Sequence, residues 1–140
     1  MTSSCNIKSV DIVAEEAAVR ATFEESIDAF SSKDWDRYAE LWVHEPYLQV
    51  VHPPQQDWIT GWNDFETSYK KLIASDVQFT FKVNRMDIKV SPTGDTAWTT
   101  VEAVLNANGQ SVTSWQMAVL QKIDGKWRYA ALFASSLPPE

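Results

Sequence analysis

The 140-residue sequence has a single cysteine, four glycines and no apolar stretch long enough to cross a membrane. Cys5 has no second cysteine to pair with, so an internal disulfide is excluded and nothing requires an oxidising compartment. A membrane-spanning helix needs ~20 consecutive apolar residues. The segment from Met1 to Val10 lacks the apolar core and cleavage pattern of a signal peptide. We therefore expect a cytoplasmic protein.

Positive charge is also scarce, because 12 Lys and Arg stand against 19 Asp and Glu and give a net charge of −7. Nucleic acids and anionic membranes both bind basic surfaces, so we expect neither as a partner. His44, Glu45 and His52 do not have the spacing of metal ligands, and no glycine-rich phosphate loop or serine elbow is present. The sequence therefore predicts no metal and no cofactor.

Aromatic residues are abundant, with seven Trp, six Phe and four Tyr. A hydrophobic fraction of 44% and a charged fraction of 22% are typical of a soluble globular protein. The length suits one domain, which we expect over residues 11–137 after a flexible lead-in over residues 1–10. Aromatic side chains in this number fill a core, line a pocket or form an interface.

Three segments carry the pattern of helices. Asp11 is a suitable N-cap, and apolar residues recur at helical spacing from there to Phe30. Asp34 caps a second, short helix that Pro46 follows. A third helix is expected after Gly61, where aromatic and aliphatic residues again recur three and four apart.

The remaining segments favour strands. Tyr47–Val51 reads as a strand that ends at His52 and two prolines, which cannot donate to a ladder. After residue 76 the apolar period changes to two, and its phase reverses around Asn84-Arg85 without a turn signal, which indicates a β-bulge. Asn108-Gly109 and Asp124-Gly125 are two-residue hairpin turns. This pattern predicts a long antiparallel meander.

The hairpin turns predict the register and therefore the residues that share a face. Counting outward from them places Thr99 opposite Ala118 and Ala118 opposite Ala131. One face then carries small side chains together with Gln116 and Phe133. The other face carries Trp98, Trp115, Met117, Val119 and Leu132.

Both predicted faces are apolar, although helices can cover only one of them. An exposed apolar patch of this size is an aggregation hazard on a monomer. We therefore expect a homodimer formed through the second face. The alternative is that a terminal segment folds over this face, which is less favourable because neither terminus is long or apolar enough.

The order helix, helix, strand, helix and meander resembles the nuclear transport factor 2-like superfamily, in particular its SnoaL-like and ketosteroid-isomerase-like branch. The resemblance rests on Lys33-Asp34-Trp35, on Gly61-Trp62-Asn63-Asp64-Phe65, and on the hairpins Gly94-Asp95-Thr96-Ala97-Trp98 and Asp124-Gly125-Lys126-Trp127-Arg128. It implies an α+β, cystatin-like fold, in which a cone-shaped, curved antiparallel sheet wraps three N-terminal helices and closes a pocket. Members act as isomerases, dehydratases, cyclases, docking proteins or assembly domains, so the fold does not fix the activity.

Three residues are candidate catalytic groups. His52 resembles the position at which ketosteroid isomerases carry an aspartate base before a proline, and its unperturbed pKa near ~6.5 suits proton transfer. Gln116 could donate a hydrogen bond to a carbonyl or a developing oxyanion, and Asp57 could approach the pocket mouth. The simpler interpretations are a solvent-facing histidine, a satisfied core glutamine and a solvated loop aspartate.

The sequence departs from the ketosteroid isomerases where Ser26 takes the place of a tyrosine and Gln116 or Ala118 that of a carboxylic acid. The leading hypothesis is a protein that binds a small apolar molecule and that, if an enzyme, is a cofactor-independent isomerase, cyclase or dehydratase acting on a cyclic substrate. The alternative is a non-catalytic dimerisation or protein-docking module. The residues expected to line the pocket are Trp42, Tyr47, Trp58, Trp62, Phe65, Tyr69, Thr99 and Phe133.

Overall fold

The computed structural model describes residues 9–52 and 57–137. Along the chain it contains the elements α1 (Ile12–Ser31), α2 (Trp35–Glu40), β1 (Gln49–His52), β2 (Asp57–Thr60), α3 (Trp62–Ile73), β3 (Phe79–Val90), β4 (Thr96–Ala107), β5 (Gln110–Ile123) and β6 (Lys126–Ser136). The strands form one sheet in the order β2-β1-β6-β5-β4-β3. Its pairs are antiparallel except for β1 and β6. No helix in these ranges is long and apolar enough to cross a membrane.

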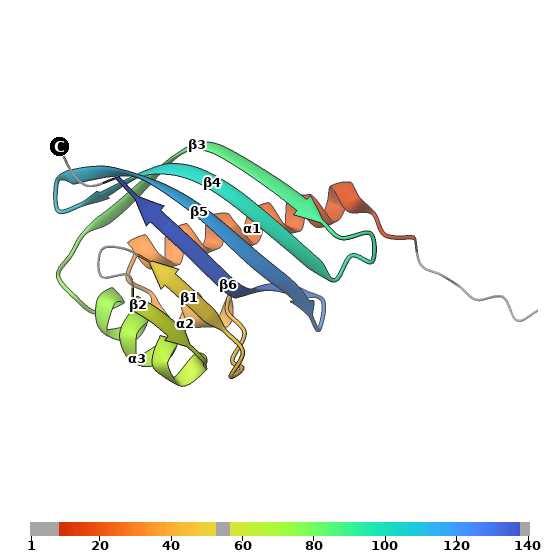
Figure 1. Ribbon diagram of the computed structural model, residues 1–140, viewed down its shortest axis with the longest axis horizontal. Helices are drawn as coiled ribbons and strands as arrows, with labels where there is room; N and C mark the ends of the chain where they lie inside the picture. Colours follow the sequence, from red (N-terminus) through yellow and green to blue (C-terminus); the bar gives the residue numbers. More distant parts are fainter. Residues whose placement is uncertain (1–8, 53–56, 138–140) are drawn as a thin grey trace, which may run out of the picture.

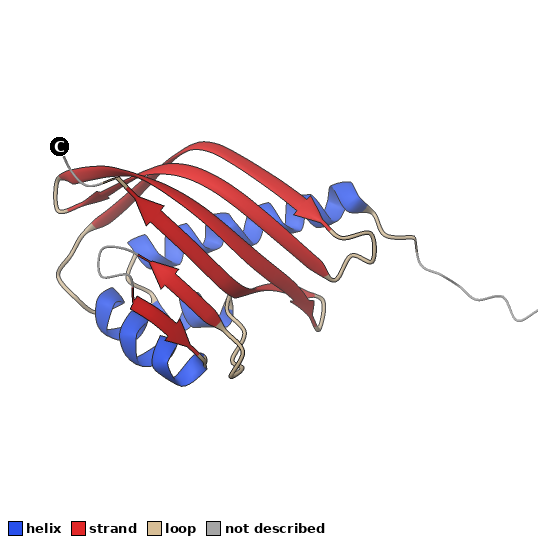
Figure 2. Ribbon diagram, in the orientation of Figure 1, coloured by secondary structure: helices blue, strands red, loops and turns tan. Residues whose placement is uncertain are grey.

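The sheet is curved and open, and the helices lie on one side of it. Figure 1 shows β3 to β6 curving across α1, while α2 and α3 lie beside the short strands β1 and β2. Figure 2 shows the same two layers by element type. The α+β fold predicted from the sequence, a curved sheet on three helices, is therefore confirmed.

The helices begin where the sequence places their caps. The Asp11 side chain accepts a hydrogen bond from the Ala14 N–H at 3.1 Å, and Asp34 accepts one from the Arg37 N–H at 3.2 Å. These bonds satisfy amides that have no partner within a first helical turn. Gly61 precedes α3 with a φ of +87°, a region that glycine adopts without strain.

A single lysine joins the end of α1 to the end of α3. Lys33 follows α1, and its Nζ donates hydrogen bonds to three backbone carbonyls: Ile73 at 3.3 Å, Ser75 at 2.5 Å and Val77 at 2.6 Å. The carbonyls at the end of a helix have no partner within the helix, and a cation there is favourable. Lys33 thereby fixes the connection from α3 to β3.

The first half of the meander has the predicted register. The pairing of β3 with β4 shifts between Val83 and Arg85, which confirms the bulge expected at Asn84-Arg85. Thr99 on β4 lies opposite Ala118 on β5, as the Asn108-Gly109 turn predicted. The residues of the turn alone were therefore sufficient to predict the register of this hairpin.

The predicted register of β5 and β6 is wrong by one residue. Leu120 pairs with Tyr129 but Val119 pairs with Ala131, so Ala130 is an extra, bulged residue. Ala118 consequently lies opposite Leu132 rather than Ala131. A bulge places every residue beyond it on the opposite face from the one that simple alternation predicts.

This bulge exchanges the faces of Leu132 and Phe133. Leu132 packs against the core, whereas Phe133 is 58% exposed on the side of the sheet away from the helices. We call the helix-covered side the inner face; it carries Ala97, Thr99, Val101, Ala103, Gln116, Ala118, Leu132 and Ala134. The opposite side is the outer face; it carries Trp98, Trp115, Met117, Val119 and Phe133.

The edge strand β2 was not expected from the sequence, which placed Asp57 in a loop. Asp57 instead begins β2, and its side chain lies outside the part of the chain that the structure describes. Val51 on β1 pairs with Trp58 on β2. The segment is too short and too close to the prolines to show the alternation of apolar and polar residues that marks a strand.

The core fills the space between the inner face and the helices. Its largest cluster is aromatic: the Phe65 ring lies 4.4 Å from Trp42 and 4.3 Å from Tyr69. A separate, smaller cluster joins Phe23 of α1 to Val101 and Ala103 of β4. The inner face between the two clusters includes Gln116.

Candidate functional site

Two of the three candidate catalytic residues lie in one row of the inner face. Gln116 on β5 pairs with Ala134 on β6. Val51 pairs with Phe133 in the parallel ladder of β1 and β6, so the next residue, His52, lies beside Ala134. Neighbouring strands are ~4.8 Å apart. If this register continues by one residue, the backbones of His52 and Gln116 are about 10 Å apart, with Ala134 on the strand between them.

His52 faces the interior rather than solvent. Leu48 and Val50, which share its side of β1, are both fully buried. The imidazole is half-buried, and its centroid lies 5.5 Å from that of Tyr69 with the two rings at 75°. This edge-to-face contact is a favourable aromatic geometry and orients the ring at the end of β1.

Small side chains surround Gln116 on the inner face. Ala118 and Ala134, its neighbours on β5 and β6, are 3% and 9% exposed. In the described ranges the only buried polar residues are Thr99 and Ser114, so no carboxylate is buried there. A proton carrier on this face would therefore be His52, and a hydrogen-bond donor would be the Gln116 amide.

Three tyrosines bring their hydroxyl groups into the interior. Tyr38 of α2, Tyr69 of α3 and Tyr129 of β6 are each 6% exposed or less. Burial raises the pKa of all three phenols, to about 12 for Tyr129. Burial is the largest cause of the raised pKa of Tyr38, and the neighbouring Tyr69 and Tyr129 raise it further. The three hydroxyl groups therefore lie close enough to interact electrostatically.

Alkaline pH should unfold the protein and ionise these tyrosines in one step. Their pKa values are raised in the folded state, so their contribution to stability is complete below the unfolded value of ~10 and decreases above it. With three groups involved, the free energy of unfolding should decrease by roughly 4 kcal/mol per pH unit above that value. Absorbance at 295 nm and tryptophan fluorescence should change together. Ionisation of all four tyrosines in the folded state would contradict this.

The residues predicted to line a pocket fall into three environments. The members packed within the core are Trp42, Phe65, Tyr69 and Thr99. Trp62 is half-buried and stacks on His44 with the ring centroids 3.6 Å apart. The exposed members are Tyr47 at 50%, Trp58 at 71% and Phe133 at 58%. The structure thus does not bring the eight together at one surface.

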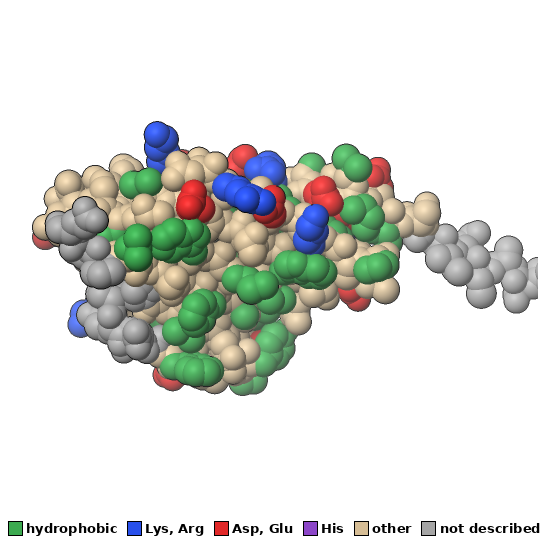
Figure 3. Space-filling model, turned by 45° about the horizontal axis from the view of Figure 1, so that its top comes forward, with side chains coloured by type: hydrophobic (Ala, Val, Ile, Leu, Met, Phe, Trp, Pro, Cys, Tyr) green, Lys and Arg blue, Asp and Glu red, His purple; other side chains and the backbone are tan. Residues whose placement is uncertain are grey.

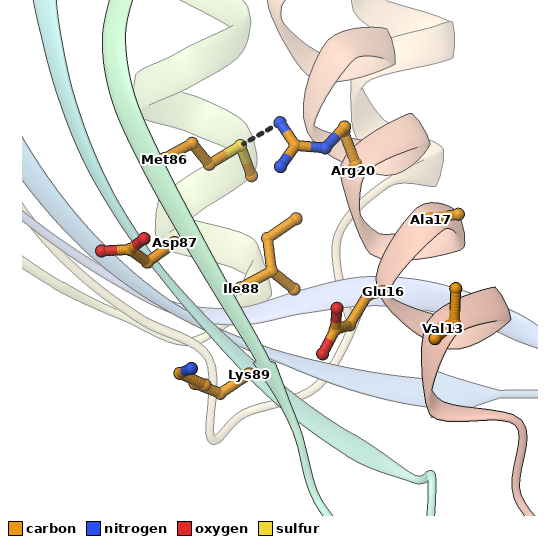
Figure 4. A pocket seen from close by; sticks show the side chains of 8 residues that line it. All are labelled: Val13, Glu16, Ala17, Arg20, Met86, Asp87, Ile88 and Lys89. Atoms are coloured by element: carbon orange, nitrogen blue, oxygen red, sulfur yellow. Dashed lines mark hydrogen bonds between the residues drawn. The ribbon is translucent and has the colours of Figure 1, made fainter.

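A shallow groove of about 290 Å³ lies between α1 and the edge strand β3. Figure 4 shows Arg20 of α1 pointing toward Met86, where its Nη1 lies 3.7 Å from the sulfur. Asp87 and Lys89 point to the opposite side of β3 from Met86 and Ile88. The charged groups do not converge on one point, so this groove lacks the arrangement of an active site.

A second groove of about 580 Å³ crosses β3 to β6 on the outer face. It is lined by Trp115, Met117 and Phe133 among others, and Val101 and Gln116 also border it. Four of the five residues predicted for the dimer interface lie on this face: Trp98 at 40%, Trp115 at 41%, Met117 at 51% and Val119 at 36% exposed. The fifth, Leu132, is on the inner face because of the bulge in β6.

The outer face has an apolar centre and a charged margin. Figure 3 shows hydrophobic side chains gathered across the middle of this view and charged side chains in a band above them. Arg85 and Asp87 on the edge strand β3 pair with each other at 3.0 Å, and Glu102 accepts a hydrogen bond from Trp115 Nε1 at 3.1 Å. This distribution is typical of an interaction surface.

No grouping of three His, Cys, Asp or Glu side chains that could hold a metal ion occurs within residues 9–52 and 57–137. The sequence pattern of the SnoaL-like domain matches residues 19–139. No protein with a curated description matches significantly.

Several solved structures share the fold at low sequence identity. A protein from Streptomyces avermitilis, provisionally named a dehydratase of the nuclear transport factor 2-like family, superposes with a TM-score of 0.81 at 18% identity, over 90% of this chain and 98% of its own. A Caulobacter vibrioides protein described as having a cystatin-like fold gives 0.73 at 12% identity, over 90% and 92%. A Thiobacillus denitrificans protein, provisionally named a calcium/calmodulin-dependent protein kinase type II association domain, gives 0.67 at 14%, over 85% and 94%.

Proposed function

The chain belongs to the family of SnoaL-like domains, and from this premise we propose that its inner face binds a small, largely apolar molecule on which His52 transfers a proton. The observation that carries the proposal is the placement of His52 and Gln116 in one row of the inner face, on either side of Ala134. The reaction we favour is a cofactor-independent dehydration. The provisional dehydratase name of the Streptomyces avermitilis structure supports this choice over isomerisation or cyclisation.

The proposed reaction needs only the groups on this face. A β-hydroxy carbonyl compound would lie between the two side chains, with its carbonyl oxygen accepting a hydrogen bond from the Gln116 amide. The neutral imidazole of His52 would remove the proton on the carbon next to the carbonyl, and Gln116 would stabilise the enolate oxygen. The enolate would then expel the hydroxyl group, which leaves as water with the proton from His52.

The two histidines allow a matched test of this role. The ligand is first identified by native mass spectrometry of the purified protein, and its conversion is followed in His52→Gln, Gln116→Ala and the control His44→Gln. General acid–base catalysis contributes about 10²–10⁴-fold, so His52→Gln should lose at least about 10²-fold in turnover with an unchanged melting temperature. His44 contacts Trp62 near the surface, and its substitution should leave turnover unchanged. Equal turnover in all variants would exclude catalysis on this face.

A second candidate function is a non-catalytic assembly or docking module, and the outer face favours it. We propose that this face joins two copies of the chain in a homodimer, whether or not the inner face is catalytic. The apolar centre and charged margin of the outer face support this arrangement. So does the association-domain name of the Thiobacillus denitrificans structure.

A further inference from the structure

The longer of the two edges of the sheet runs along β3. This strand is the last in the sheet order, so one of its sides has no neighbouring strand among the described residues. Its pairing with β4 is regular from Arg85 to Val90, after the bulge. The outward backbone N–H and C=O groups of such a stretch can pair with another extended chain. The opposite edge strand, β2, has only four residues.

A groove beside this edge exposes apolar side chains. It lies between α1 and β3 and has a volume of about 290 Å³. Val13 and Ala17 line it from the helix, and Met86 and Ile88 line it from the strand. Val13 is 77% exposed, more than any other large hydrophobic side chain in the described residues. An extended chain paired with β3 would direct every second side chain toward this groove and cover Val13.

The other side of the same stretch carries charges of alternating sign. Asp87 and Lys89 point away from the groove, and Arg85 lies on their side of the strand, where it pairs with Asp87 at 3.0 Å. The Arg85 and Asp87 side chains are 77% and 50% exposed, so their ion pair is open to solvent and contributes little to stability. A neighbouring strand with acidic, basic and acidic side chains at every second position would place an opposite charge beside each of the three residues.

We propose that the edge of β3 binds an extended segment of another protein, which adds to the sheet as a further strand. The segment carries acidic, basic and acidic residues opposite Arg85, Asp87 and Lys89, and the apolar residues between them face the groove. A second copy of this chain fits less well. Its own β3 has two basic residues and one acidic residue in this stretch, so no register places an opposite charge beside all three. The site requires neither the proposed reaction nor the proposed homodimer.

Two matched peptides test this proposal. The peptide acetyl-SEVKVES-amide has the proposed charges, and acetyl-SKVEVKS-amide has every charge reversed. Binding to the ¹⁵N-labelled protein is measured by NMR titration, and hydrogen exchange of the β3 amides is recorded with and without excess peptide. The first peptide should bind at least about tenfold more tightly and should protect alternate amides between Arg85 and Val90. The net charge of the protein, −7, favours the reversed, cationic peptide, so general electrostatic attraction predicts the opposite order.

A charge-swapped protein completes the test. Arg85→Glu, Asp87→Lys and Lys89→Glu combined should invert the preference between the peptides, whereas Lys70→Glu, an equal change of net charge at an exposed position of α3, should preserve it. An unchanged preference in the triple variant, or binding of neither peptide by the wild type, would overturn the proposal. Protection of the outward β3 amides without peptide would also overturn it, since a second copy of the chain would then occupy the edge.

Discussion

Lys33→Met is expected to lower the free energy of unfolding by about 3–5 kcal/mol, since hydrogen bonds from a charged group contribute about 1.5–3 kcal/mol each. Three carbonyls, those of Ile73, Ser75 and Val77, accept bonds from the lysine Nζ. Methionine has a similar length and no donor, so these carbonyls would need water in a partly buried position. Urea denaturation followed by tryptophan fluorescence measures the change.

Two further variants separate the lysine bonds from other effects. Lys71→Met removes an exposed lysine from the last turn of α3 and should change the stability by less than about 0.5 kcal/mol. Lys33 has a φ of +61°, so Lys33→Gly removes the same bonds but relieves about 1 kcal/mol of backbone strain. Lys33→Gly should therefore be more stable than Lys33→Met. Equal stability of Lys33→Met and Lys71→Met would show that the three bonds contribute nothing.

The parts of the fold that could be predicted are those determined by residues close together in the sequence. The caps at Asp11 and Asp34 and the turn Asn108-Gly109 each determine the backbone through the residues themselves. The bulge at Asn84-Arg85 was visible because the strands on both sides of it are long enough to show a change of phase. Lys33 had no such signal, because its acceptors lie more than 35 residues away along the chain, at separations of 40, 42 and 44.

The candidate site was less predictable because its geometry depends on pairing. Ala130 is bulged among alanines, where no alternation marks the extra residue, so the faces of Leu132 and Phe133 were reversed. The row that holds His52 and Gln116 depends on the parallel pairing of β1 with β6, which joins segments far apart in the sequence.

Met117→Asp is expected to convert the proposed homodimer into a monomer. Met117 is 51% exposed at the centre of the outer face, where it pairs with Phe133 on β6 and with Thr100 on β4. In a two-fold symmetric interface each substitution occurs twice. A buried, unpaired carboxylate costs about 3–5 kcal/mol, so two of them should weaken association by roughly 10⁴-fold or more. Light scattering during size-exclusion chromatography gives the mass directly.

The matched control places the same charge on a different exposed apolar residue. Val13 is 77% exposed on α1, away from the outer face, and Val13→Asp should keep the mass of the wild type. A stable dimer needs about 800 Å² of contact from each partner, and Met117 lies at the centre of the proposed contact. Dissociation by Met117→Asp alone would therefore place the contact across β5 and β6. If both variants and the wild type elute with the mass of one chain, the outer face does not join two copies, and its exposed tryptophans would need a different partner.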